Sequence, residues 1–411
     1  MIDYSVFTLD NGLRVVHHFD DSTSHVAVNV LYDVGARDES PSLTGMAHLF
    51  EHLMFGGSVN VPDYDYAIEM AGGSNNAWTS NDFTNFYDVV PAANLETAFW
   101  AESDRMYSLA FDERSLEVQR GVVMEEFKQV CLNKPYGDTG HLLRGLLYKV
   151  HPYGWPTIGK ELSHIERVTM ADVRRFFFSH YSPSNAVLAV AGPVALGEVR
   201  RLAEKWFGPI ERRATAPRLY APEPEITEAR SLTVEADVPQ TKITLAVPMG
   251  GRLDADFPVS DLLTDVLASG NSSRFYRNLV LGTDLFTSAD ASVAGSEEPG
   301  FLMLNGSLRS NDGQSIDLAR RALWNEARRI ADEGVTADEL ERTLNRFECN
   351  AEFTAVSYLA KAQALAKSVM RGIDHNSVLP AYRSVTEADI KRVASELLKP
   401  ERCCTLIYKS R

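Results

Sequence analysis

The chain has 411 residues, of which 45% are hydrophobic and 24% are charged, and its formal net charge is −15 at pH 7. This length and apolar content suffice for two or more globular domains, each with its own core. The acidic balance argues against nucleic acid or an anionic membrane as the main partner, because both require a basic face on the protein.

Cysteine usage and the chain's first residues bear on the compartment. The four cysteines show no Cys-x-x-Cys spacing, so no disulfide framework is expected. No apolar run reaches the roughly 18 residues of a membrane-spanning helix, and the first residues lack the features of a signal peptide. The sequence as given predicts a cytoplasmic protein without a membrane span, with the periplasm as the alternative if an export signal has been removed.

The first half of the chain predicts a mixture of strands and helices. Alternating apolar residues around the turn signal Asn11-Gly12 favour a β-hairpin. The predicted elements are strands at 6–9, 13–17 and 26–32, helices at 46–55 and 62–72, two strands within 74–91, helices at 95–110, 114–131 and 170–180, a strand at 186–192, and a helix that ends at 207.

Residues 211–228 are rich in proline and mixed charges, which predicts an interdomain linker. Beyond it a similar order begins again. The predicted elements are strands at 231–234 and 241–247, a helix at 259–268, a strand at 301–306, helices within 314–333, 336–371 and 386–398, and a last strand at 404–408. The fold class is therefore expected to be α+β, with two similar domains, 1–210 and 229–411, each a mostly antiparallel sheet covered by helices.

The predicted helix at 46–55 carries His48, Glu51 and His52 in an otherwise apolar run. On a helix these three side chains share one face, since positions i, i+3 and i+4 are neighbours. Two imidazoles in this spacing can reach one zinc ion, and the carboxylate beside them can take a proton from water. His-x-x-Glu-His is the inverzincin signature. The alternative is a hydrogen-bonded polar patch in a core, so a third ligand is needed.

This motif, followed downstream by a glutamate on a predicted helix, resembles the pitrilysin/insulinase superfamily of zinc peptidases. Further stretches resemble its short bacterial branch, which is similar to the subunits of mitochondrial processing peptidase. These stretches are Gly72-Gly-Ser-Asn-Asn-Ala-Trp-Thr, Glu102-Ser-Asp-Arg-Met, His151-Pro-Tyr and Tyr181-Ser-Pro-Ser-Asn-Ala. The resemblance is close over the first half and loose over the second.

The resemblance also selects the third ligand. Glu125 and Glu126 point about 100° apart on a helix, so only one of them can share the zinc face. The family pattern falls on Val122-Val123-Met124-Glu125-Glu126 and implies Glu126. Two turns earlier the family usually carries an outer carboxylate, where this chain has Gln119, an amide that can still hydrogen-bond a ligand.

The resemblance implies a zinc metalloendopeptidase in which His48, His52 and Glu126 hold Zn2+ and Glu51 is the general base. The substrate is expected to add as a strand along Asn76, Ala77 and Trp78, although a plain hairpin under the helix is the alternative for each of these residues. The two halves of the chain, and of a partner, are expected to enclose a chamber that admits peptides and unfolded segments.

One departure from the family concerns the second half. Active members carry an Arg and a Tyr that bind the substrate carbonyl, and Val280 and Thr287 occupy those positions here. We therefore expect a heterodimer with a homologous chain that lacks the zinc motif and supplies this pair, with a homodimer as the alternative. The competing functions are a non-catalytic scaffold or binding subunit and, more remotely, another metal-dependent amidohydrolase.

Overall fold

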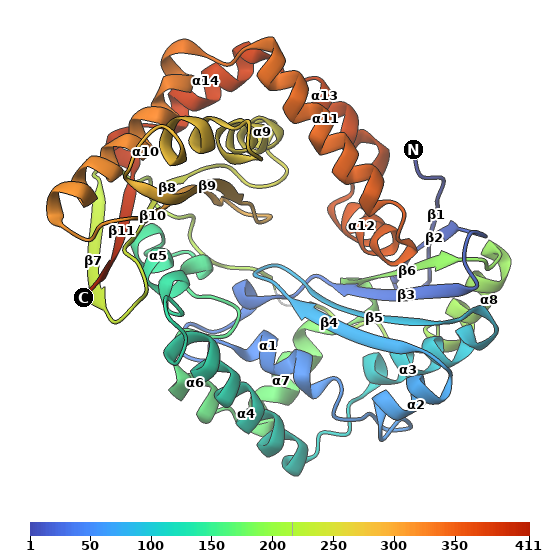
Figure 1. Ribbon diagram of the computed structural model, residues 1–411. Coiled ribbons are helices and arrows are strands. Elements are labelled where there is room, and N and C mark those ends of the chain that lie inside the picture. Colours follow the sequence, from blue (N-terminus) through green and yellow to red (C-terminus); the bar gives the residue numbers. More distant parts are fainter. Residues whose placement is uncertain (216) are drawn as a thin grey trace. The chain divides into compact units, whose positions relative to one another are not determined.

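The computed structural model describes residues 1–215 and 217–411 and divides into two compact units (Figure 1). The first unit comprises Met1–Lys128, Trp155–Tyr220 and Ala351–Val378; the second comprises Gln129–Gly154, Ala221–Asn350 and Leu379–Arg411. Each unit is built from three chain segments. The domain boundaries at 1–210 and 229–411 stay a prediction. Within the predicted linker 211–228, residue 216 lies outside the described residues, and the described remainder forms neither helix nor strand.

The first unit contains a six-stranded sheet in the order β1-β2-β6-β3-β5-β4. Its pairs are antiparallel except for β2 and β6, which are parallel. Gly12 adopts φ 89° in the predicted hairpin turn, a backbone conformation that favours glycine. The strands are β1 (Ser5–Thr8), β2 (Arg14–Phe19), β3 (His25–Tyr32), β4 (Ser74–Thr79), β5 (Thr84–Pro91) and β6 (Ala186–Gly192).

Helices cover both faces of this sheet (Figure 1). On one face α12 (Tyr358–Arg371) packs Leu365 and Ala366 against Ala27 and Leu31 of β3. Tyr32 follows Leu31 and so points to the opposite face. There its ring contacts those of Phe86 and Tyr181, and Tyr181 stacks on Phe50 of α1. The other helices of this unit are α1 (Met46–Leu53), α2 (Tyr64–Met70), α3 (Leu95–Tyr107), α4 (Glu113–Phe127), α6 (Leu162–Glu166), α7 (Met170–His180) and α8 (Leu196–Trp206).

The second unit repeats this plan with a five-stranded sheet in the order β7-β11-β8-β10-β9. Without β1, the first sheet has the matching order β2-β6-β3-β5-β4, and in both sheets a parallel pair is followed by antiparallel pairs. The strands are β7 (Arg230–Ala236), β8 (Lys242–Pro248), β9 (Phe286–Ala294), β10 (Phe301–Leu308) and β11 (Cys404–Ser410). The predicted α+β class with two halves of similar plan is confirmed.

One face of the second sheet is covered by α5 (Thr139–Leu147), whose Leu143 and Leu147 share a core cluster with Ala246, Phe301 and Leu406. The remaining helices are α9 (Phe257–Ala268), α10 (Gly313–Glu333), α11 (Ala337–Thr354), whose last residues belong to the first unit, α13 (Val378–Arg383) and α14 (Glu387–Leu397). Every helix in the described part of the chain is too short or too polar to cross a bilayer.

Candidate metal centre

Helix α1 carries the predicted motif, and its first turn is held by the carboxylate of Glu39, which precedes the helix in sequence. Gly45 at the N-cap has φ 89° and no side chain that could cap the helix. Glu39 replaces that cap: its carboxylate accepts hydrogen bonds from the backbone N–H groups of Gly45 (2.9 Å) and Ala47 (2.8 Å). A third N–H, Nε1 of Trp155, donates to the same carboxylate at 3.0 Å. Two backbone donors at the helix start that have no intrahelical partner are thereby satisfied.

Glu39 is buried beside the N–H groups at the start of α1. Burial raises the pKa of this carboxyl to about 8, and the N–H donors of Ala47, Gly45 and Trp155 oppose that rise. The geometry therefore fixes where α1 begins and how it is oriented.

The segment after α1 is anchored by α3. The Asp104 carboxylate accepts hydrogen bonds from Ser58 Oγ at 2.6 Å and from the Asn60 backbone N–H at 2.8 Å. In the same turn of α3, Glu102 and Arg105 form an ion pair with no solvent exposure. The stretch Glu102-Ser-Asp-Arg-Met that carried part of the family resemblance is thus a support for the end of the motif helix.

Helix α4 brings the third candidate ligand to α1. The helix begins at Asp112, whose side chain accepts the N–H of Ser115, and it buries Val123 and Phe127. Glu126 lies on the side of α4 that faces the histidines, whereas Glu125 is exposed and pairs with a lysine one turn on. A π-helical turn, Lys128–Leu132, follows directly.

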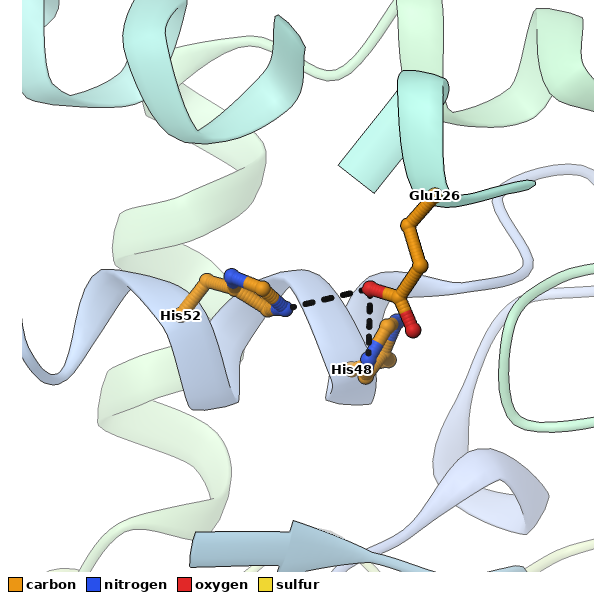
Figure 2. A group of neighbouring side chains, drawn as sticks. All are labelled: His48, His52 and Glu126. Atoms are coloured by element: carbon orange, nitrogen blue, oxygen red, sulfur yellow. Dashed lines mark ion pairs between the residues drawn. The ribbon is translucent and has the colours of Figure 1, made fainter. Parts of the chain in front are cut away.

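The side chains of His48, His52 and Glu126 converge (Figure 2). Each histidine Nε2 lies 3.6 Å from Glu126 Oε2, and the candidate ligand atoms all lie within 4.8 Å of one another. A separation of 3.6 Å is long for an N–H···O hydrogen bond. It is close to the roughly 3.3 Å between neighbouring ligand atoms around a tetrahedral zinc ion. Among residues 1–215 and 217–411 this is the one group of three or more such side chains positioned to share a metal ion.

The protonation state of His48 suits a metal ligand. Burial lowers the pKa of His48, while the charge of Glu126 opposes that shift. The ring is therefore neutral near pH 7, and the neutral imidazole is the form that binds a metal. Two nitrogens and one carboxylate oxygen are also a donor set that zinc accepts. The residues present fit a zinc ion.

Glu51 lies on the same helix, half-buried, with its carboxylate directed at β4. Thr79 Oγ1 donates a hydrogen bond of 2.5 Å to Glu51 Oε2. Burial raises the pKa of Glu51, the Thr79 hydrogen bond opposes this, and the charge of Glu126 adds to it. A carboxyl whose pKa is moved towards neutrality is better suited to general base catalysis than an ordinary glutamate.

The three residues predicted to bind substrate lie on β4, an edge strand that pairs with β5 alone among the described residues. Asn76 is exposed and Ala77 is half-buried. Trp78 is packed towards α12, where Lys367 Nζ lies 4.5 Å from the centre of its ring. The free side of β4 can therefore accept another strand, and the Trp78 side chain faces away from Glu51.

The remaining predicted positions are also placed. Gln119 is half-buried on α4, two turns before Glu126. Val280 ends a π-helical turn, and the exposed Thr287 on β9 donates its hydroxyl to Ser307 O at 3.2 Å. Neither carries the guanidinium or phenol that the family uses. Sequence reasoning did not single out Glu39, which no local pattern marks, or Thr79, which closes the quoted stretch beginning at Gly72.

Two family models match this chain. The model described as insulinase (peptidase family M16) matches residues 14–149, and the model described as peptidase M16 inactive domain matches residues 167–347. His48, His52 and Glu126 all lie within the first match, and none lies within the match to the inactive domain.

Relatives cover most of the chain. Zinc protease PqqE of Helicobacter pylori is 28% identical, over 98% of this chain and 92% of that protein. A probable mitochondrial-processing peptidase subunit beta of Arabidopsis thaliana is 28% identical, over 65% of this chain and 51% of its own length. The crystal structure of a protease from Helicobacter pylori matches with a TM-score of 0.92 at 25% identity, over the full length of both chains. The chain therefore belongs to the insulinase family of peptidases, peptidase family M16, within the pitrilysin/insulinase superfamily.

Proposed function

We propose that this chain is the metal-bearing subunit of a zinc-dependent endopeptidase. The observation that carries the proposal is the convergence of two histidine nitrogens and the Glu126 carboxylate beside Glu51. The name of the Helicobacter pylori relative, a zinc protease, supports the choice of metal. His48, His52 and Glu126 would hold the ion.

A bound zinc ion would supply Lewis-acid polarisation of the scissile carbonyl and would lower the pKa of water. The protein's own contribution to hydrolysis lies in Glu51. Its carboxylate accepts the proton of the attacking water and then donates that proton to the leaving nitrogen of the peptide. Because Glu51 is half-buried, bulk water screens its carboxylate charge less than it would screen an exposed one.

The substrate is a peptide or an unfolded segment in extended conformation. Edge strand β4 offers unpaired backbone groups to such a segment, and the small side chain of Ala77 leaves room for main-chain contact. A folded protein has few extended segments free to pair in this way. We include in the proposal the enclosed chamber that the family resemblance implies.

We further propose that the catalytic unit is a heterodimer. Preorganised donors at a developing oxyanion are commonly worth about 10²- to 10³-fold each in rate, and Val280 and Thr287 supply neither the Arg nor the Tyr. A homologous chain without the His-x-x-Glu-His motif could provide both. Zinc binding does not require that pair.

The test is turnover of a quenched, unstructured peptide by the zinc-loaded chain, alone and with the homologous partner chain. We expect slow cleavage by the chain alone and an increase of orders of magnitude on addition of the partner. Glu51→Gln should keep its zinc and lose activity by about 10²-fold or more, because the amide cannot accept the proton. Ordinary rates for the isolated chain, unchanged by the partner, would contradict the heterodimer.

A second function, a non-catalytic scaffold or binding subunit, is favoured by the same missing pair at Val280 and Thr287. The two functions differ in the effect of Glu51→Gln. A scaffold would show no peptide turnover in any combination, and its complex would form equally well with either residue at position 51.

A further inference from the structure

We propose that Thr79 is a positioning residue that holds the general base Glu51 in register with the substrate strand. This inference rests on the proposed function, in which Glu51 takes the proton of water and β4 binds the substrate. It starts from the short hydrogen bond, 2.5 Å, between Thr79 Oγ1 and Glu51 Oε2.

Thr79 is the single hydrogen-bond partner of the Glu51 carboxylate among residues 1–215 and 217–411. A glutamate side chain has three rotatable bonds, and a half-buried one without a partner would sample several rotamers. The bond to Thr79 fixes one of the two carboxylate oxygens. The other oxygen, Oε1, is left free to accept a proton.

The backbone at Thr79 is itself held firmly. Thr79 pairs with Thr84 as the last residue of β4, and the turn that follows is closed by the Ser80 N–H bonded to Phe83 O at 2.8 Å. The Ser80 carbonyl and its neighbour Asn81 accept backbone N–H groups from the segment after β3. Because threonine is branched at Cβ, its hydroxyl has few directions available once the backbone is fixed. The donor is therefore preorganised.

The position of Thr79 on β4 connects the hydrogen bond to Glu51 with the strand that is proposed to bind the substrate. β4 is the edge strand along which the substrate backbone is proposed to lie. Trp78 faces α12 and Thr79, the next residue, faces α1, as the strand alternation requires. The same rigid strand thus fixes both the scissile peptide and the base. Reacting groups misplaced by about 1 Å can lose on the order of 10² in rate.

The test compares Thr79→Val, which removes the hydroxyl at nearly constant volume, with Thr79→Ser, which keeps it. Both are measured in the full zinc-loaded chain, with the partner chain present. We expect Thr79→Val to lower kcat by about 10- to 100-fold with little change in KM, zinc content or melting temperature. Thr79→Ser should recover most of kcat. Thr233→Val makes the same change at an exposed position of β7. It is the matched control and should behave like the wild type.

A readout independent of activity is the crystal structure of each variant. Thr79→Val should release the Glu51 carboxylate from its position, and Thr79→Ser should retain it. An unchanged Glu51 position and kcat in Thr79→Val would overturn the inference while leaving the proposed function intact. A loss of zinc or of folding stability in Thr79→Val that Thr79→Ser does not rescue would also overturn it, since the role would then be structural.

The proposed function can fail separately. If the wild-type chain and its partner show no turnover, but Glu51 is displaced only in Thr79→Val, the positioning role stands and the peptidase does not. If Glu51 is undisplaced as well, both are refuted.

Discussion

Replacing Glu39 by alanine is expected to destabilise the start of α1, although Glu39 contacts neither the metal ligands nor the general base through a hydrogen bond. The substitution removes the acceptor of two backbone N–H donors, those of Gly45 and Ala47, while Trp155 Nε1 keeps Ala36 O as an acceptor at 3.0 Å. The loss is the same whether the Glu39 carboxyl is ionised or protonated, because alanine can accept no side-chain hydrogen bond.

The magnitude follows from the two backbone donors that lose their acceptor. A buried donor left without a partner costs about 1–3 kcal/mol, and water that enters the space keeps each cost near the lower limit. The sum is about 2 kcal/mol for the N–H groups of Gly45 and Ala47. In a unit of roughly 150–250 residues, each kcal/mol shifts the melting temperature by about 2–4 °C. Glu39→Ala should therefore melt about 4–8 °C below the wild type.

The assay is calorimetric unfolding of the full chain, combined with a zinc titration. Zinc affinity should also fall, because His48 and His52 lie on the helix that Glu39 holds. Glu198→Ala is the matched control: it removes an exposed glutamate from α8 that pairs with Arg201 at 2.7 Å, and such solvent-exposed ion pairs contribute little to stability. A melting temperature for Glu39→Ala equal to that of Glu198→Ala would refute the role assigned to the Glu39 cap.

Three further predictions concern the metal site and the acid range. Glu126→Ala should lose bound zinc by elemental analysis, whereas Glu125→Ala should retain it; the reverse result would overturn the ligand assignment. Chelation should lower the melting temperature of the wild type and leave that of Glu126→Ala unchanged, because only the former has an ion to lose. Lys361 holds the pKa of Asp20 at about 2, below the ordinary value of 3.8. A lowered carboxyl pKa stabilises the fold above the unfolded pKa, and this is lost as pH falls from about 3.8 through about 2. The free energy of unfolding of Asp20→Asn should fall less steeply with pH in that range than that of the wild type. An unchanged slope would contradict this.

The sequence predicted α1 and the neighbourhood of Glu126 because both depend on local periodicity. His48, Glu51 and His52 fall on one face through helical spacing alone. Glu126 was distinguished from Glu125 by the family pattern, and in the structure the burial of Val123 and Phe127 turns Glu126 towards α1.

Strand β9 and helix α5 were not predicted. β9 contains the run Thr287-Ser-Ala-Asp-Ala-Ser, which lacks the alternation of a typical strand, and it forms by pairing with β10. No helix was expected at α5, where Gly140 and Gly145 lower the local propensity and packing of Leu143 on the second sheet stabilises it. Both depend on contacts that are distant in sequence.

The predicted helical stretch 336–371 is two helices, α11 and α12, separated near Ser357, whose side chain caps α12 by accepting the Ala360 N–H. The sequence has neither Gly nor Pro at this break. A serine cap alone is a weak signal, because Ser occurs in helices as well. The contact of α12 with the first sheet could not be predicted from local sequence.

The place of α12 in the first unit sets an order for biosynthesis. The ribosome releases His48, His52 and Glu126 long before it reaches Tyr358–Arg371, so the first sheet emerges with the apolar face at Ala27 and Leu31 uncovered. Uncovered apolar surface on a nascent chain attracts chaperones or leads to aggregation. A fragment that ends at Tyr220 would carry every candidate ligand and still lack the helix that closes its core, so truncation at the linker would give an insoluble product.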